Sequence, residues 1–127
     1  MRGADLKKTN EEYSLLYDFY GALLSARQRE VFELYNEDNL TLSEIGANLG
    51  VSRQAVHIAV LKACEELEGY EEKLGLIAKH KSCEKIQEEI DAKIDELLKD
   101  KARTIIADPD MGKTLRRIKR LVKELYL

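Results

Sequence analysis

Five residues in the middle of the chain have side chains suited to contacting duplex DNA. Ser52, Arg53 and Gln54 follow one another, His57 comes one helical turn after Arg53, and Lys62 lies farther along. Arginine can pair with guanine and glutamine with adenine, usually from the N-terminal end of a helix in the major groove. His57 could reach a base or a phosphate, and Lys62 could neutralise a phosphate. The alternative interpretation is an ordinary solvated helix end.

A helix-turn-helix would place these residues correctly. Thr41 and Glu44 have the spacing of a capping box, which predicts a short helix over residues 42–49. Gly50 then permits a sharp turn because it adopts the left-handed conformation at little cost, and Ser52 caps the next helix. Gly46 supplies the small residue that two steeply crossing helices require. The alternative is any helical hairpin with a glycine turn. The apolar residues expected to hold both helices are Ile45, Leu49, Val51, Val56 and Val60.

Further amphipathic helices flank the motif. The first is predicted from Thr9-Asn10 to about Leu24, with Leu23 on its apolar face, and Ser25 is expected to cap a second that ends at a polar turn over residues 36–39. The apolar stripe of the motif's last helix continues to residue 77, which indicates a long helix. Beyond it, we expect one helix capped by Ser82 and another from Asp108-Pro109 to about residue 126.

The composition supports a helical protein. Charged residues make up 35% of the chain, there is one proline and no tryptophan, and the helix-favouring residues alanine, leucine, glutamate and lysine are abundant. We predict an all-α fold, in which residues 1–77 form a helix-turn-helix domain of four helices, the last one long, and residues 78–127 form an extension of two helices. The narrow apolar stripes of this extension need a partner, and a second copy of the chain would give a homodimer.

Charge and hydropathy complicate the assignment of DNA binding. The net charge is −3, and residues 1–70 carry seven Lys/Arg against twelve Asp/Glu, or −5, whereas DNA-binding domains usually present a basic surface. On a helical wheel, Ile58 and Leu61 lie at the centre of the outward face of the recognition helix, and Glu65 follows them. Two outward aliphatic residues suggest that this face packs against protein.

A second charged feature occurs near the C-terminus. Six basic residues wind onto one side of the last predicted helix, and apolar residues occupy the other side. Such a helix could bind nucleic-acid phosphate, an anionic membrane surface or an acidic protein, although a solvated face over a packed stripe is the commoner explanation. The interaction candidates among the six are Arg116, Arg117 and Arg120.

Other functional classes have little support in the sequence. There is no secretion signal and no long uncharged apolar run, so we expect a cytoplasmic protein without a membrane span. Cys64 and Cys83 lack the paired spacing of a zinc or redox site, and His57 and His80 are isolated. Because neither a glycine-rich phosphate loop nor a nucleophile elbow is present, we predict no enzyme, no cofactor and no metal site.

The sequence resembles two known groups. Segments 24–31 (LSARQREV), 42–46 (LSEIG) and 49–56 (LGVSRQAV) are similar to the C-terminal DNA-binding region of bacterial sigma factors. Segments 17–20 (YDFY), 27–29 (RQR), 52–56 (SRQAV) and 68–74 (EGYEEKL) resemble more closely the YlxM family of helix-turn-helix proteins. The second resemblance implies a bacterial protein encoded beside genes of the signal recognition particle GTPases, and therefore a regulatory part in that protein-targeting pathway.

Two functions follow as hypotheses. The first is a regulator that binds double-stranded DNA through Ser52, Arg53, Gln54 and Lys62. The second is an interaction module that binds a protein or the RNA of the signal recognition particle through Ile58, Leu61 and the C-terminal helices, without binding DNA.

Overall fold

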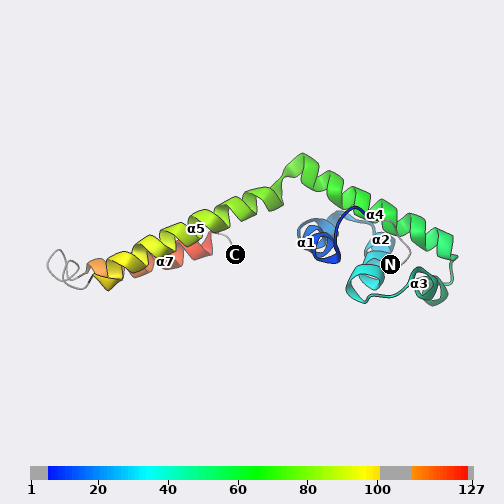
Figure 1. The fold of residues 1–127 in the computed structure, drawn as a ribbon, viewed down its shortest axis with the longest axis horizontal. Helices are drawn as coiled ribbons and strands as arrows, with labels where there is room; N and C mark the ends of the chain where they lie inside the picture. The colour runs from blue at the N-terminus through cyan, green and yellow to red at the C-terminus, as the bar shows by residue number, and fades with distance from the viewer. Residues whose placement is uncertain (1–5, 101–109, 126–127) are drawn as a thin grey trace. The chain divides into compact units, whose positions relative to one another are not determined.

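The computed structural model describes residues 6–100 and 110–125, and all regular structure within them is helical (Figure 1). The predicted all-α class is therefore confirmed. The chain divides into two compact units, Met1–Ile77 and Ala78–Leu127. No helix in the described ranges is long and apolar enough to cross a membrane.

In the first unit, three short helices pack against one long helix (Figure 1). The short helices are α1 (Asn10–Tyr20), α2 (Ala26–Phe32) and α3 (Leu42–Leu49), and the long helix is α4 (Arg53–Leu74). Each short helix starts with a complete capping box, in which the capping side chain and the third helical residue satisfy each other's backbone N–H groups. The caps predicted at Ser25 and Thr41 are confirmed, and Thr9 caps α1.

The core of this unit lies where the three short helices meet α4. Tyr17 of α1 stacks on Phe32 of α2 with ring centroids 4.7 Å apart, and the buried side chains around this pair form one continuous cluster. The buried cluster comprises Tyr13, Leu16, Tyr20, Leu24, Val31, Phe32, Tyr35, Leu42, Ile45, Val56, Val60, Ala63, Cys64, Leu67 and Ile77.

The end of the first helix differs from the prediction. The chain tightens at Gly21 into a short 3₁₀-helix, η1 (Gly21–Leu23). Gly21 lies against the Tyr17 ring, where a Cβ would be 2.8 Å from the ring carbons. A 3₁₀-helix has three residues per turn, whereas an α-helix has 3.6, so Leu23 is rotated away from the core. Leu23 is 55% exposed, and its predicted place on the apolar face was wrong.

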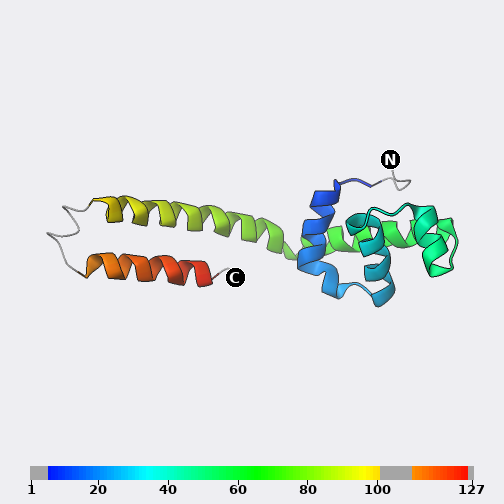
Figure 2. The same cartoon turned by 90° about the horizontal axis from the view of Figure 1, so that it is seen from below.

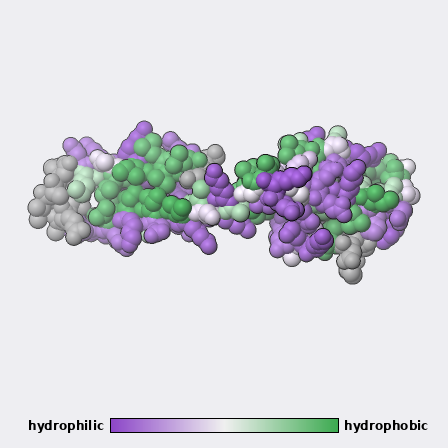
Figure 3. Space-filling view, turned by 90° about the horizontal axis from the view of Figure 1, so that it is seen from above, coloured by the Kyte–Doolittle hydropathy of each residue, from purple (hydrophilic) through white to green (hydrophobic). Residues whose placement is uncertain are grey.

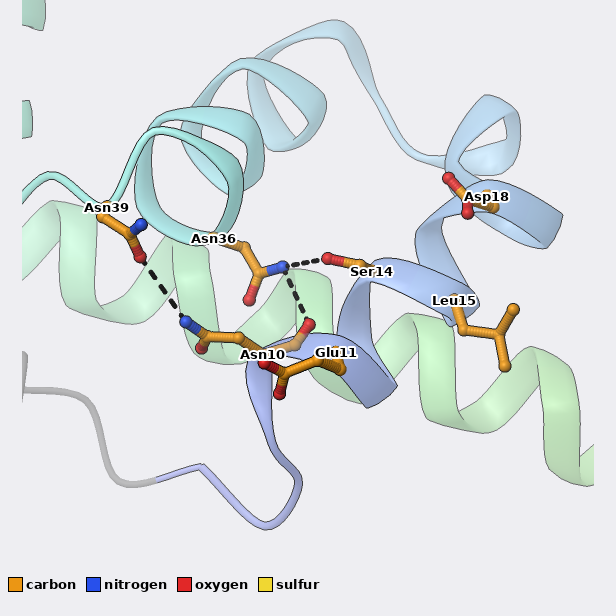
Figure 4. Close-up of a pocket in the computed structure, with 7 residues that line it drawn as sticks. All are labelled: Asn10, Glu11, Ser14, Leu15, Asp18, Asn36 and Asn39. Carbon is orange, nitrogen blue, oxygen red and sulfur yellow. Dashed lines mark hydrogen bonds between the residues drawn. The ribbon is translucent and has the colours of Figure 1, made fainter.

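The second helix continues into a widened helical turn, η2 (Glu33–Glu37), of π type, which includes the first half of the polar turn predicted over residues 36–39. It buries Asn36, whose amide nitrogen donates to the backbone oxygen of Asn10 at 3.2 Å and to the hydroxyl of Ser14 at 2.9 Å (Figure 4). Asn10 in turn donates to Asn39, whose positive φ of 57° closes the loop toward α3. These polar contacts fix α1 against η2 beside the apolar core.

Helix α4 continues through Gly69 and ends at Gly75, which adopts the left-handed conformation with φ of 62°. The next helix, α5 (Leu76–Lys99), begins immediately. The cap predicted at Ser82 was therefore wrong, and the reason lies in tertiary contacts. Tyr20 accepts a hydrogen bond from the backbone N–H of Leu76, and the Glu71 carboxylate accepts one from that of Ile77, so the helix starts seven residues earlier than expected.

The second unit is an antiparallel pair formed by most of α5 and by α7 (Met111–Glu124), which lie side by side (Figure 2). Ile94 of α5 is buried in the pair. The Lys119 ammonium of α7 lies 2.7 Å from the Asp95 carboxylate and 3.4 Å from that of Asp91, both on α5. The start predicted at Asp108-Pro109 and the end predicted near residue 126 lie outside the described residues.

Candidate nucleic-acid interface

The crossing of α3 and α4 is set by two glycines. A Cβ placed on Gly46 would lie 2.8 Å from the backbone oxygen of Val51, so the two backbones approach too closely for any other residue. Gly50 has φ of 70°, and its N–H and that of Val51 both bond to the backbone oxygen of Gly46. The turn of the helix-turn-helix predicted from the sequence is therefore fixed by backbone contacts.

Ser52 caps α4, and its hydroxyl accepts a hydrogen bond from the backbone N–H of Ala55 at 3.0 Å. This cap fixes the first turn of the helix, and Arg53 and Gln54 occupy the first two positions with exposed side chains. Because the caps and the backbone crossing determine where α4 starts, both side chains are presented at the helix end where recognition helices contact base edges.

The rest of the outward face is mixed. Ile58 is 57% exposed, but Leu61 is half-buried, so the aliphatic surface is smaller than a helical wheel indicates. His57 is also half-buried, and its Nε2 atom is covered and has no hydrogen-bond partner. This nitrogen therefore does not face solvent, where a base or phosphate would approach.

Lys62 lies apart from the other four DNA-binding candidates. It is nine residues beyond Arg53, or about 13 Å along the helix axis at 1.5 Å per residue. It lines a groove together with Glu65, Glu66 and Lys73, so its charge is balanced there by carboxylates. The structure thus brings Ser52, Arg53 and Gln54 together and leaves Lys62 in a separate groove of mixed charge.

Arg27 is a residue near this interface that sequence reasoning missed. It lines a cavity of about 140 Å³ together with Val51 of the turn and Ala55 and Ala59 of α4. Its guanidinium is 3.8 Å from the Glu30 carboxylate, and both side chains are more than half exposed, so this ion pair is weak. The capping box at Ser25 places Arg27 in the first turn of α2, but its proximity to α4 depends on tertiary packing.

The described residues offer neither a metal-binding cluster nor, at Cys64, a reactive thiol. Among residues 6–100 and 110–125, no three His, Cys, Asp or Glu side chains are placed to hold a metal ion. Cys64 is buried, and burial together with the nearby charges of Glu68 and Glu65 raises the pKa of its thiol to about 12. The thiol is therefore protonated near neutral pH and unsuited to nucleophilic attack.

Comparisons with known proteins identify relatives across most of the chain. Residues 6–106 match the UPF0122 family, described as "Putative helix-turn-helix protein, YlxM / p13 like". A UPF0122 protein of Caldanaerobacter subterraneus subsp. tengcongensis is 53% identical over 79 residues, which cover 59% of this chain and 68% of the relative. One of Thermoanaerobacter sp. strain X514 is 40% identical over 114 residues, covering 90% of this chain and 93% of the relative. The chain therefore belongs to the UPF0122 family of YlxM/p13-like helix-turn-helix proteins.

Proposed function

We propose that this protein is a regulator that binds double-stranded DNA through the N-terminal end of α4. The observation that carries the proposal is the exposure of Arg53 and Gln54 on the first turn of a helix whose position is set by the contact between Gly46 and the backbone of Val51. Arginine and glutamine are the residue types that distinguish guanine and adenine in the major groove. Ser52 supports them by capping the helix.

Electrostatics sets the expected character of this binding. Arg27 supplies a positive charge beside α4, where it can contact a phosphate flanking the bases read by Arg53. The surrounding unit is acidic, however, so binding to arbitrary duplex through this surface should be weak and most of the affinity should depend on the correct sequence. We include His57 and Lys62 only as peripheral contacts, because His57 is partly covered and Lys62 lies in a separate groove whose carboxylates compete for its charge.

The test starts from selection of a preferred duplex out of a randomised pool by the full chain, followed by titration at about 50 mM salt. Arg53→Ala should weaken binding to the selected duplex by roughly 5- to 150-fold, equivalent to about 1–3 kcal/mol for a bidentate base contact. Lys73→Ala, at the exposed far end of the same helix, is the matched control and should change little. Failure to enrich any duplex would refute the proposal.

A second candidate function is favoured by Ile58, which is 57% exposed in the middle of the recognition face. An exposed isoleucine there is better suited to a protein surface than to a phosphate backbone. With the half-buried Leu61, it could contact a protein of the signal recognition particle, the pathway implied by the YlxM resemblance. Titration with the purified GTPase, and separately with the particle's RNA, would test this. Ile58→Glu should abolish protein binding and leave the fold intact.

We also propose that the second unit forms a homodimer. Several of its large apolar side chains are exposed, and Figure 3 shows a continuous hydrophobic area on one face of this unit with hydrophilic borders. These side chains are Ile86 at 57%, Ile118 at 39%, Leu121 at 43% and Leu125 at 70% exposure. A second antiparallel pair would cover them and complete a four-helix bundle. Sedimentation should show a dimer that Ile118→Glu with Leu121→Glu converts to monomers.

A further inference from the structure

A groove of about 610 Å³ on α7 is lined by five basic side chains. These are Lys113, Arg116, Lys119, Arg120 and Lys123. Their spacing of three and four residues places them along one side of the helix, which spans about 15 Å from the first to the last at 1.5 Å per residue. No acidic side chain is among the described residues that line the groove.

Among residues 6–100 and 110–125, only Lys119 of these five has an ion-pair partner. Lys119 is half-buried and bonds to Asp95 and Asp91 of α5, and these carboxylates raise the pKa of its ammonium. The other four side chains are exposed, and within the described ranges none has a carboxylate within 4.0 Å. Lys119 thus anchors α7 to α5, while four charges face solvent along the groove.

We propose that this groove binds the phosphodiester backbone of a nucleic-acid duplex, independently of sequence. Each strand of a duplex carries one negative charge per about 3.4 Å of its axis, so 15 Å of helix can follow about four phosphates. Residues 111–124 contain no aromatic side chain on which a single-stranded base could stack, and no Asn or Gln to read adenine. Arginine can also pair with guanine, but five cations along one side of a helix match a row of phosphates, so charge and spacing carry the recognition.

This groove is a site additional to the base-reading end of α4, and it lies in a different compact unit. It also gives the acidic protein a source of non-specific affinity that the first unit lacks, since residues 78–127 carry thirteen Lys/Arg against ten Asp/Glu. The proposal does not require Arg53 to contact a base, so either proposal can fail without the other.

The test uses the full chain and a duplex of random sequence, with binding measured from about 50 to 200 mM salt. Arg116→Gln with Arg120→Gln removes two groove charges. Arg117, an interaction candidate from the sequence, is not among the residues that line the groove. Arg117→Gln with Lys99→Gln therefore removes two exposed charges outside the groove lining and is the matched control. The groove variant should reduce the slope of log affinity against log salt by about 2 and the control by less than half of that, with unchanged helix content in both.

Two further arms separate the possible ligands. A duplex RNA of the same sequence carries the same backbone chemistry. Comparing the affinity that the groove variant loses for the DNA duplex with the affinity that it loses for the RNA duplex shows which of the two the groove prefers. Vesicles of anionic phospholipid present phosphate without a duplex backbone. Vesicle binding through Arg116 and Arg120 with no effect on either duplex would overturn the proposal, as would equal slopes for the groove variant and its control.

The outcome is distinguishable from that of the proposed regulatory function. If Arg53→Ala removes sequence preference while random duplex still binds in a groove-dependent manner, both proposals stand. If no sequence preference exists but the groove variant loses its salt slope, the groove proposal stands alone. If Arg53→Ala abolishes binding to random duplex as well, the groove contributes nothing and the proposal is wrong.

Discussion

Three glycines of the first unit lie in different environments, and replacing each with alanine should change the stability of the unit differently. The close contact between α3 and α4 concerns the first of them. At Gly46, the added methyl group would lie 2.8 Å from the Val51 backbone oxygen. Relieving this clash would require one of the two helix backbones to shift. At Gly50, the methyl group would meet nothing within 4 Å, but φ of 70° is unfavourable for alanine. At Gly69, in the interior of α4, the methyl group meets nothing and φ is ordinary.

The magnitudes follow from these three environments. Gly69→Ala should stabilise by up to about 1 kcal/mol, because alanine is the better helix former. Gly50→Ala should destabilise by about 1–2 kcal/mol through the left-handed conformation alone. Gly46→Ala gains the same helix propensity but suffers a backbone clash worth about 3 kcal/mol, so we expect a net loss of about 2 kcal/mol.

Urea unfolding provides the measurement, with tyrosine near-ultraviolet circular dichroism as the probe. The buried rings of Tyr13, Tyr20 and Tyr35 all belong to the first unit, so this signal reports on the unit that contains the glycines. The free energy of unfolding from the transition midpoint and slope gives each difference. If Gly46→Ala were as stable as Gly69→Ala, the close backbone crossing described here would be refuted.

Two further predictions concern buried hydroxyl and thiol groups. Tyr20→Phe removes a hydroxyl that bonds to Glu71 and to the Leu76 backbone, and urea titration should show a loss of about 2 kcal/mol, against under about 1 kcal/mol for Tyr17→Phe at an exposed carboxylate. Burial raises the pKa of Cys64 from 9.0 and that of Tyr17 from 10.0, each to about 12. The unfolded chain therefore ionises first, and stability that is complete below pH 9 should fall as pH rises toward 12. In an alkaline titration by circular dichroism, Cys64→Ala should move the onset of this fall toward pH 10, and an unchanged onset would contradict the role of the thiol.

Local signals made the helix-turn-helix predictable. The capping boxes at Ser25 and Thr41 and the left-handed turn at Gly50 each depend on a few neighbouring residues, so the sequence was enough to place them. The same signals placed Arg53 and Gln54 at an exposed helix start. The separation of Lys62 from them also follows from its sequence spacing.

The features that were missed depend on contacts between distant segments. Tyr20 and Glu71 satisfy the start of α5, and without knowledge of those contacts Ser82 was the best local cap. The widened turn η2 accommodates Asn36 between Asn10 and Ser14, a tertiary requirement with no local signature. The placement of Arg27 beside α4 likewise arises from packing.

The backbone contact at Gly46 has a consequence for how such a protein can diverge. Because the geometry of the crossing depends on a glycine and a carbonyl oxygen, the exposed side chains of Arg53, Gln54 and Ile58 contribute little to it. Substitutions at these three positions should therefore alter what the helix recognises at small cost in stability. A descendant could change its binding preference by one residue at a time and remain folded at every step.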